Sequence, residues 1–424
     1  CRQAADQGLP GGAAQGADKS TNSRRECWDL AKLLLVWCVV SCHIESFLLY
    51  QFFELKVDQT WTGKWAFMPY AVPGLVFISG VFSQNTNTKF FVATVIGLPL
   101  TLLLFCVSMC VMTAITPGFI IFEIGRSGVE WYLESLIFWR IILAPLFSMA
   151  RKLGVPTVTV FACVFLLCSW LWCTFAYTGQ ERSLINGVVT KANIPLATLT
   201  PWRHTLYFAP FFALGLTLRV EQWTAVFQSR VAMVAAFLVQ LAYCIAMLHS
   251  HSFAEWYTPS CKIHGQCETH WWPLNVQLHQ ASWSSFGTYL LVFLQHLTLL
   301  FTVVPCMEGA QRVLHHACPR LRAWLVNCGS QTFYPYLLHW VLIICPMCRC
   351  GGGLLLRDWF FPMETYKIWL VVILGATAAE LLLCCRVTVF LFAWLFQIPE
   401  WIFRLAQRQN EKFGEKARET ENKC

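Results

Sequence analysis

The chain has 424 residues, of which 57% are hydrophobic and only 13% are charged, whereas ordinary soluble domains carry about 25% charged residues. This balance excludes a typical soluble enzyme and indicates a polytopic membrane protein. The net charge of +8 is spread over the chain ends and loops, without a dense basic stripe. We therefore expect no nucleic-acid partner, and we expect the charge to orient the protein in a lipid bilayer and to attract a phosphate-bearing ligand.

Ten apolar runs are long enough to cross a bilayer as helices of roughly 20 residues. They lie at residues 30–52, 66–83, 90–113, 131–150, 156–178, 204–219, 229–248, 285–305, 332–349 and 366–390. The sequence thus predicts an all-α fold, a polytopic membrane protein with about ten transmembrane helices. This domain would cover residues 28–400, between a disordered N-terminal tail (1–27) and a charged C-terminal tail (401–424).

Basic residues indicate how the chain crosses the membrane. If the N-terminus is cytosolic, each cytosolic turn carries at least one of them, drawn from Arg24, Arg25, Lys89, Arg151, Lys152, Arg219, Arg230, Arg312, Arg320 and Arg322. This satisfies the positive-inside rule, so we expect both termini in the cytosol. The sequence leaves the organelle open.

The first run, WDLAKLLLVWCVVSCHIESFLLY, holds ionisable groups inside an apolar segment. Lys32 and His43 are eleven residues apart, about three helical turns and about 16 Å along the axis, which places them on one face. Asp29 lies one turn before Lys32 and is expected to pair with it. Lys32 is then either a snorkelling anchor or a cation for a ligand. His43 is either a functional group or a neutral histidine bonded to a neighbouring helix.

Two further runs carry groups of interest. In VPGLVFISGVFSQ, residues 72–84, small residues predict a broken helix that lines a cavity, or else close helix packing. In the fourth run Arg140 lies midway, and Glu134 precedes it by nearly two turns. If this helix runs inward, Glu134 is placed to orient the His43 ring and Arg140 to meet ligand charge. The alternative is an internal ion pair that steadies the bundle.

Five segments occur in a familiar order. They are WDLAKLLLVWCVVSCHI, VPGLVFISGVFSQ, WYLESLIFWRIILAPLF, RHTLYFAPFFALGLTL and GSQTFYPYLLHWVLI, spread from residue 28 to residue 343. Together they resemble the acyltransferase 3 family of integral membrane acyltransferases, and within it the fucose 4-O-acetylase-like branch. The resemblance implies an acyl-CoA donor, usually acetyl-CoA, on the cytosolic side. It also implies a hydroxyl acceptor, commonly on a glycan, on the other side.

The resemblance also assigns residues. The family pattern of a basic residue, ten others and a histidine matches Lys32 and His43, with Lys where Arg is usual. The family's Ser-Gly pair matches Ser79 and Gly80, and its late histidine matches His339.

Acyl transfer from a thioester needs a base with a pKa near neutrality and donors for the oxyanion. We expect His43 as the base, supported by Glu134. We expect the oxyanion donors to come from Ser79, an amide near Gly80 or a buried cation. The predicted acyl-CoA-binding residues are Lys32, Ser79, Gly80, Arg140, Arg151 and Lys152, and the predicted acceptor-side residues are Arg203, Tyr336 and His339. For Tyr336 and His339, one helical turn apart, plain packing is the alternative.

Other functions are weighed against this one. A secondary transporter of a small solute shares the hydropathy and the buried charges, but it predicts a repeat that the sequence does not display. A receptor or scaffold is the third class. The loop 249–282 interleaves Cys261 and Cys267 with His264 and His270, which fits a disulfide or an ordinary loop better than a metal site. We therefore predict no metal.

Overall fold

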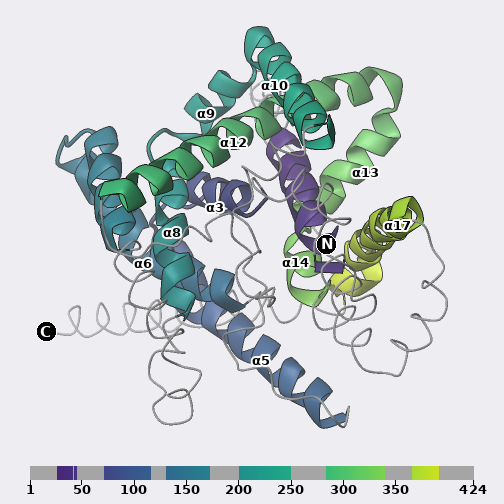
Figure 1. Cartoon of the computed structure of the whole chain (residues 1–424). Helices are drawn as coiled ribbons and strands as arrows, with labels where there is room; N and C mark the ends of the chain where they lie inside the picture. Colours follow the sequence, from purple (N-terminus) through teal and green to yellow (C-terminus); the bar gives the residue numbers. More distant parts are fainter. Residues whose placement is uncertain are drawn as a thin grey trace, which may run out of the picture.

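The computed structural model describes residues 26–41, 43–44, 71–115, 130–171, 200–249, 283–339 and 365–390 (Figure 1). Nearly all of these residues are helical, and no strand occurs among them. The predicted all-α fold is confirmed. Each of the ten apolar runs contains at least part of a described helix.

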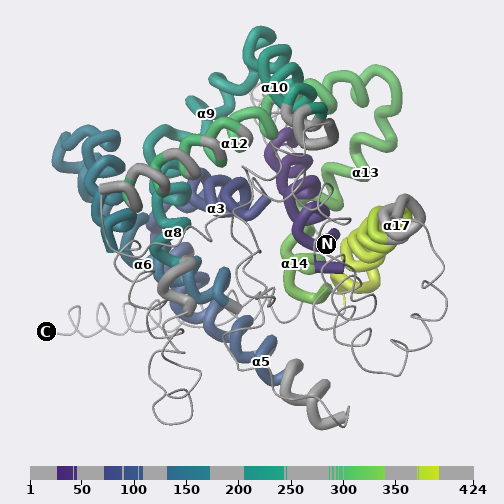
Figure 2. The backbone as a smooth tube through the Cα atoms, viewed as in Figure 1, coloured from purple at the N-terminus to yellow at the C-terminus, as the bar shows by residue number. Residues whose placement is uncertain are grey.

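The described helices follow one another with short breaks. They are the first helix (26–41), α3 (Ala71–Val81), α4 (Thr88–Val92), the π-helical turn η2 (Ala93–Gly97), α5 (Leu98–Ile115), α6 (Glu130–Lys152), the helix Thr157–Leu171, α8 (Thr200–Gly215), α9 (Val220–Phe227), α10 (Arg230–His249), α12 (Trp283–Ala317), α13 (Pro319–Ser330), α14 (Phe333–His339) and α17 (Thr365–Leu383). The first helix lies in the middle of the bundle, between α12 and α14 (Figure 2). Residues 43 and 44 are also helical.

Several described helices are suited to a membrane. Three stretches are long and apolar enough to cross one, namely Phe90–Val107, Trp131–Lys152 and His296–Ala317. A fourth results if α9 and the following residues 230–242, which meet at 70°, count as one broken span. The other apolar helices, such as Ala71–Val81 and Thr157–Leu171, are shorter. The count of ten spans therefore stays a prediction.

Two glycines let α3 and α8 touch backbone to backbone. A Cβ at position 80 would lie 2.1 Å from the carbonyl oxygen of Phe212, and a Cβ at position 215 would lie 2.3 Å from that of Phe77. Side chains essentially never approach so closely, so only glycine fits at either position. The prediction of a broken second span is wrong, because α3 is continuous from Ala71 to Val81. Pro73 falls in the first turn, where no amide donor is needed.

The cytosolic-side end of the first helix, as predicted, is anchored by Trp28 and Glu26. The Trp28 indole is fully buried and donates a hydrogen bond to Thr224 of α9 over 3.1 Å. The Glu26 carboxylate forms an ion pair with Arg322 of α13 at 2.9 Å. Between them, burial and the nearby Glu308 carboxylate raise the pKa of the Cys27 thiol, which keeps this thiol protonated. These contacts fix the helix that carries Lys32 and His43.

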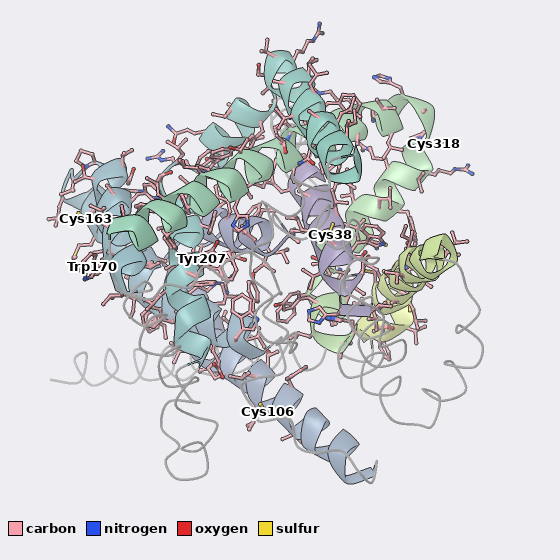
Figure 3. The ribbon with its side chains drawn as sticks, viewed as in Figure 1. Cys38, Cys106, Cys163, Trp170, Tyr207 and Cys318 are labelled. Carbon is pink, nitrogen blue, oxygen red and sulfur yellow. The ribbon has the colours of Figure 1, made fainter. Side chains whose placement is uncertain are left out.

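The ten described cysteines whose side chains are placed are all free thiols. Their interpretation as core residues is correct for Cys38 and Cys168, which are buried, but not for Cys163, which is exposed (Figure 3). Cys163 lies on the outer face of its helix together with Leu166 and Leu167, which are also exposed. Such a face suits lipid. Cys261 and Cys267 lie outside the described residues.

Candidate active site

Five parts of the chain surround one cavity of about 470 Å³. They are the first helix, α3, the continuous stretch from α4 through η2 into α5, α6, and the junction of α13 with α14. The walls are largely apolar, with a limited set of polar side chains among them. These are Lys32, Ser79, Thr101, Tyr132, Arg140, Ser330, Thr332 and Tyr336. An apolar cavity with convergent polar groups is the usual form of a small-molecule site.

Helical periodicity explains why these side chains converge. On α6, Tyr132, Leu136 and Arg140 follow at intervals of four, so they form one stripe along the cavity. The wall opposite includes the π-helical turn η2, where Ala93 and Gly97 contribute little side-chain bulk. Such π turns occur frequently at functional sites.

Lys32 is held at the cavity by two groups. Its ammonium lies 2.6 Å from the Asp29 carboxylate, which confirms the pairing expected from the i, i+3 spacing. It also lies 5.9 Å from the centre of the Phe82 ring. Because Lys32 lines the cavity, the structure favours a ligand-facing cation over a simple surface anchor.

Arg140 brings a second positive charge to the same cavity. Its Nε donates a hydrogen bond to the Ser83 hydroxyl over 3.2 Å, and its guanidinium lies over the Phe90 ring at 5.4 Å. Within the part of the chain that the structure describes, no carboxylate forms an ion pair with Arg140. The expected internal pair with Glu134 is therefore not formed. Glu134 is half-buried on α6 and is not part of the cavity lining.

Ser79 and Tyr132 form a hydroxyl pair in the cavity wall. Their oxygens are 2.8 Å apart, and either hydroxyl can be the donor. The Tyr132 ring also contacts the Tyr336 ring of α14, with centroids 5.0 Å apart. Ser79 was predicted from the sequence, but Tyr132 was missed. The signal that could have found it is its place on the Arg140 stripe, eight residues earlier.

His43 and His339 form a buried imidazole pair next to the cavity. Their ring centroids are 5.1 Å apart. Nδ1 of His339 lies 2.8 Å from the carbonyl oxygen of Pro335, which can only accept, so this nitrogen carries a proton. In the neutral ring Nε2 of His339 is then the basic nitrogen. Tyr336, 6.3 Å from His339 between ring centroids, connects the pair to the cavity lining.

The remaining predicted site residues lie elsewhere. Gly80 packs against Phe212 and does not line the cavity. Arg151 donates a hydrogen bond to the carbonyl of Leu216, just past the end of α8, so it caps that helix end instead of facing the cavity. Lys152 is exposed at the end of α6. The Arg203 side chain lies outside the described residues.

Metal ligands were also considered. Among the described residues, no group of three or more His, Cys, Asp and Glu side chains is placed to hold a metal ion. The loop with His264 and His270 is not among those residues.

Comparisons of the chain with protein-family models, curated proteins and solved structures gave no match. The argument for a function accordingly rests on the residues and on this geometry.

Proposed function

We propose that the protein is a membrane-bound O-acyltransferase. It moves an acyl group, most simply acetyl, from cytosolic acyl-CoA to a hydroxyl of a carbohydrate or other acceptor across the membrane. One observation carries the proposal. Lys32, Ser79 and Arg140, selected by residue type from three separate runs, line one cavity that adjoins the His43–His339 pair.

The cavity chemistry fits a thioester donor. Lys32 and Arg140 supply positive charge, and Ser79 supplies a hydroxyl, all against apolar walls. A cavity of about 470 Å³ is within the roughly 300–1,000 Å³ range of small-molecule sites, which suits an acyl group with part of its pantetheine arm. The nucleotide of the donor would remain outside it, toward the cytosolic ends of the helices.

In this proposal His43 takes the proton of the acceptor hydroxyl while the hydroxyl oxygen attacks the thioester carbon. The membrane arrangement has about ten spans with cytosolic termini, so donor and acceptor enter from opposite sides. The site then transfers the acyl group without moving CoA across the bilayer.

The decisive experiment uses the full chain in lipid nanodiscs with acetyl-CoA labelled in the acetyl group. We expect label transfer to glycan or lipid extracts, or slow hydrolysis, and we expect His43→Ala and His43→Gln to abolish both. Thermal unfolding of the two variants establishes that they are folded. The proposal is wrong if folded wild-type protein processes none of a series of acyl-CoAs, or if both variants match it.

One observation favours a second candidate, a transporter of a small anionic solute. Arg140 faces the cavity without a carboxylate partner among the described residues, as in a site for an anion. Uptake of labelled anions into proteoliposomes that requires an ion gradient, together with no acyl-CoA turnover, would decide for this alternative.

A further inference from the structure

We infer that the Tyr132 hydroxyl is a catalytic group, which donates a hydrogen bond to the oxyanion formed from the donor's thioester carbonyl, with Ser79 as its positioning residue. This inference rests on the proposed acyl transfer and adds a residue that the sequence comparison with the family did not supply.

The position of Tyr132 supports this role. Its side chain is 7% exposed, and that exposure faces the cavity, which Tyr132 lines. Its hydroxyl is held at 2.8 Å from the Ser79 hydroxyl. When Ser79 donates in this pair, the Tyr132 proton is directed to a further acceptor, and a hydroxyl that accepts one hydrogen bond becomes a stronger donor.

Distance along α6 distinguishes Tyr132 from Arg140. The oxyanion must form near the base, and Tyr132 is linked toward His43 by the rings of Tyr336 and His339, with successive centroid separations of 5.0, 6.3 and 5.1 Å. Arg140 lies eight residues further along the helix, about 12 Å at 1.5 Å per residue. Arg140 is therefore placed for a charge at the other end of the donor. Its field still acts on Tyr132 and favours the phenol as a donor.

The step balances as a simple acyl transfer. The acceptor oxygen bonds to the thioester carbon, the carbonyl π electrons move onto its oxygen, and the acceptor proton passes to His43. Tyr132 stabilises the resulting oxyanion by its O–H group without giving up the proton. The carbonyl then re-forms, the carbon–sulfur bond breaks, and the CoA thiolate takes the proton from His43.

The alternative is that Tyr132 serves only as packing. Its ring does belong to an aromatic cluster, with Trp131 at 6.0 Å and Trp139 at 6.4 Å between centroids. A packing role depends on the ring, whereas catalysis depends on the hydroxyl. The substitution Tyr132→Phe separates the two.

Tyr289→Phe is the matched control. Tyr289 is also buried, at 1% exposed, and its hydroxyl donates to the carbonyl of Tyr207 over 3.1 Å, away from the cavity. Both substitutions thus remove one buried hydroxyl that forms a hydrogen bond. We expect Tyr132→Phe to lower kcat by roughly 100- to 1,000-fold, the usual effect of losing one oxyanion donor. We expect its KM for acyl-CoA, and its affinity for a non-reactive thioether analogue, to change less than about threefold.

Ser79→Ala provides a second variant. We expect a smaller loss of kcat, about tenfold, again with unchanged affinity for the analogue, and little further loss when it is combined with Tyr132→Phe. Tyr289→Phe is expected to leave kcat unchanged. The inference is overturned if Tyr132→Phe retains kcat within threefold, or if it only matches Tyr289→Phe in kcat and thermal stability.

The two proposals fail differently. If wild-type protein transfers or hydrolyses no acyl group, the proposed function itself is wrong. If wild type is active and His43→Gln is inactive while Tyr132→Phe is active, only the role of Tyr132 is wrong.

Discussion

The imidazoles of His43 and His339 contact each other with ring centroids 5.1 Å apart, although one belongs to the first helical run and the other to α14. Both side chains are buried. Because the Nδ1 proton of His339 is directed to the Pro335 carbonyl, the ring is fixed in orientation and presents Nε2 on its other side. His339 is therefore more than a packing residue.

The first prediction concerns this pair. We expect His339→Ala to lower kcat by about 100-fold, at the low end of the effect of general acid–base groups, with little change in KM for acyl-CoA. His315→Ala is the control, since His315 is exposed near the end of α12. Steady-state turnover of labelled acyl-CoA measures both. Equal activity of the two variants would show that the contact with His43 has no part in the reaction.

Lys32 provides the second prediction. We expect Lys32→Ala to raise KM for acyl-CoA by about tenfold to 100-fold, the equivalent of one hydrogen bond to a charged group at about 1.5–3 kcal/mol. Lys32→Arg should retain most of the affinity, because it keeps the cation that lines the cavity.

Two controls accompany this prediction. Arg320→Ala removes an exposed cation on α13 and should change KM little. Asp29→Asn removes the partner at 2.6 Å but leaves the ammonium, so binding should persist and depend more steeply on ionic strength. If Lys32→Ala binds acyl-CoA as wild type does, Lys32 is only a membrane anchor.

The third prediction tests whether the cavity holds the donor. Ala93 of η2 lines the cavity, and Val95, two residues on, does not and is 43% exposed. Ala93→Trp should fill part of the cavity and weaken acyl-CoA binding by more than tenfold. Val95→Trp adds bulk to the same turn and should leave binding unchanged. Calorimetry with a thioether analogue in nanodiscs compares them, and equal affinities would place the donor elsewhere.

What the sequence could predict is set by the range of each interaction. Apolar runs and i, i+3 spacing are local, so the helical class and the Lys32–Asp29 pair were accessible. The Ser79–Tyr132 hydrogen bond joins two helices, and nothing in either segment alone specifies the partner. Tyr132 was missed for that reason.

The errors have the same origin. Arg151 was assigned to ligand phosphates because it is a cation at a helix end, but the carbonyl that it meets belongs to Leu216, beyond another helix. Gly80 was assigned to the ligand by its motif, whereas the Phe212 backbone occupies the space beside it. Spacing within one segment cannot show which backbone group approaches from another.

Gly80 gives the last prediction, on stability. A Cβ at position 80 would lie 2.1 Å from the Phe212 carbonyl oxygen, and backbone on both sides resists displacement. We expect Gly80→Ala to reduce the free energy of unfolding by at least about 1–3 kcal/mol, as overpacking does. Gly375→Ala is the matched control in α17, because a Cβ there meets no atom within 4 Å. It should leave stability unchanged or raise it by up to about 1 kcal/mol, since alanine favours helix. Thermal unfolding in one detergent measures both. A Gly80→Ala variant that unfolds like wild type but no longer binds acyl-CoA would instead restore the ligand contact predicted from the Ser-Gly motif.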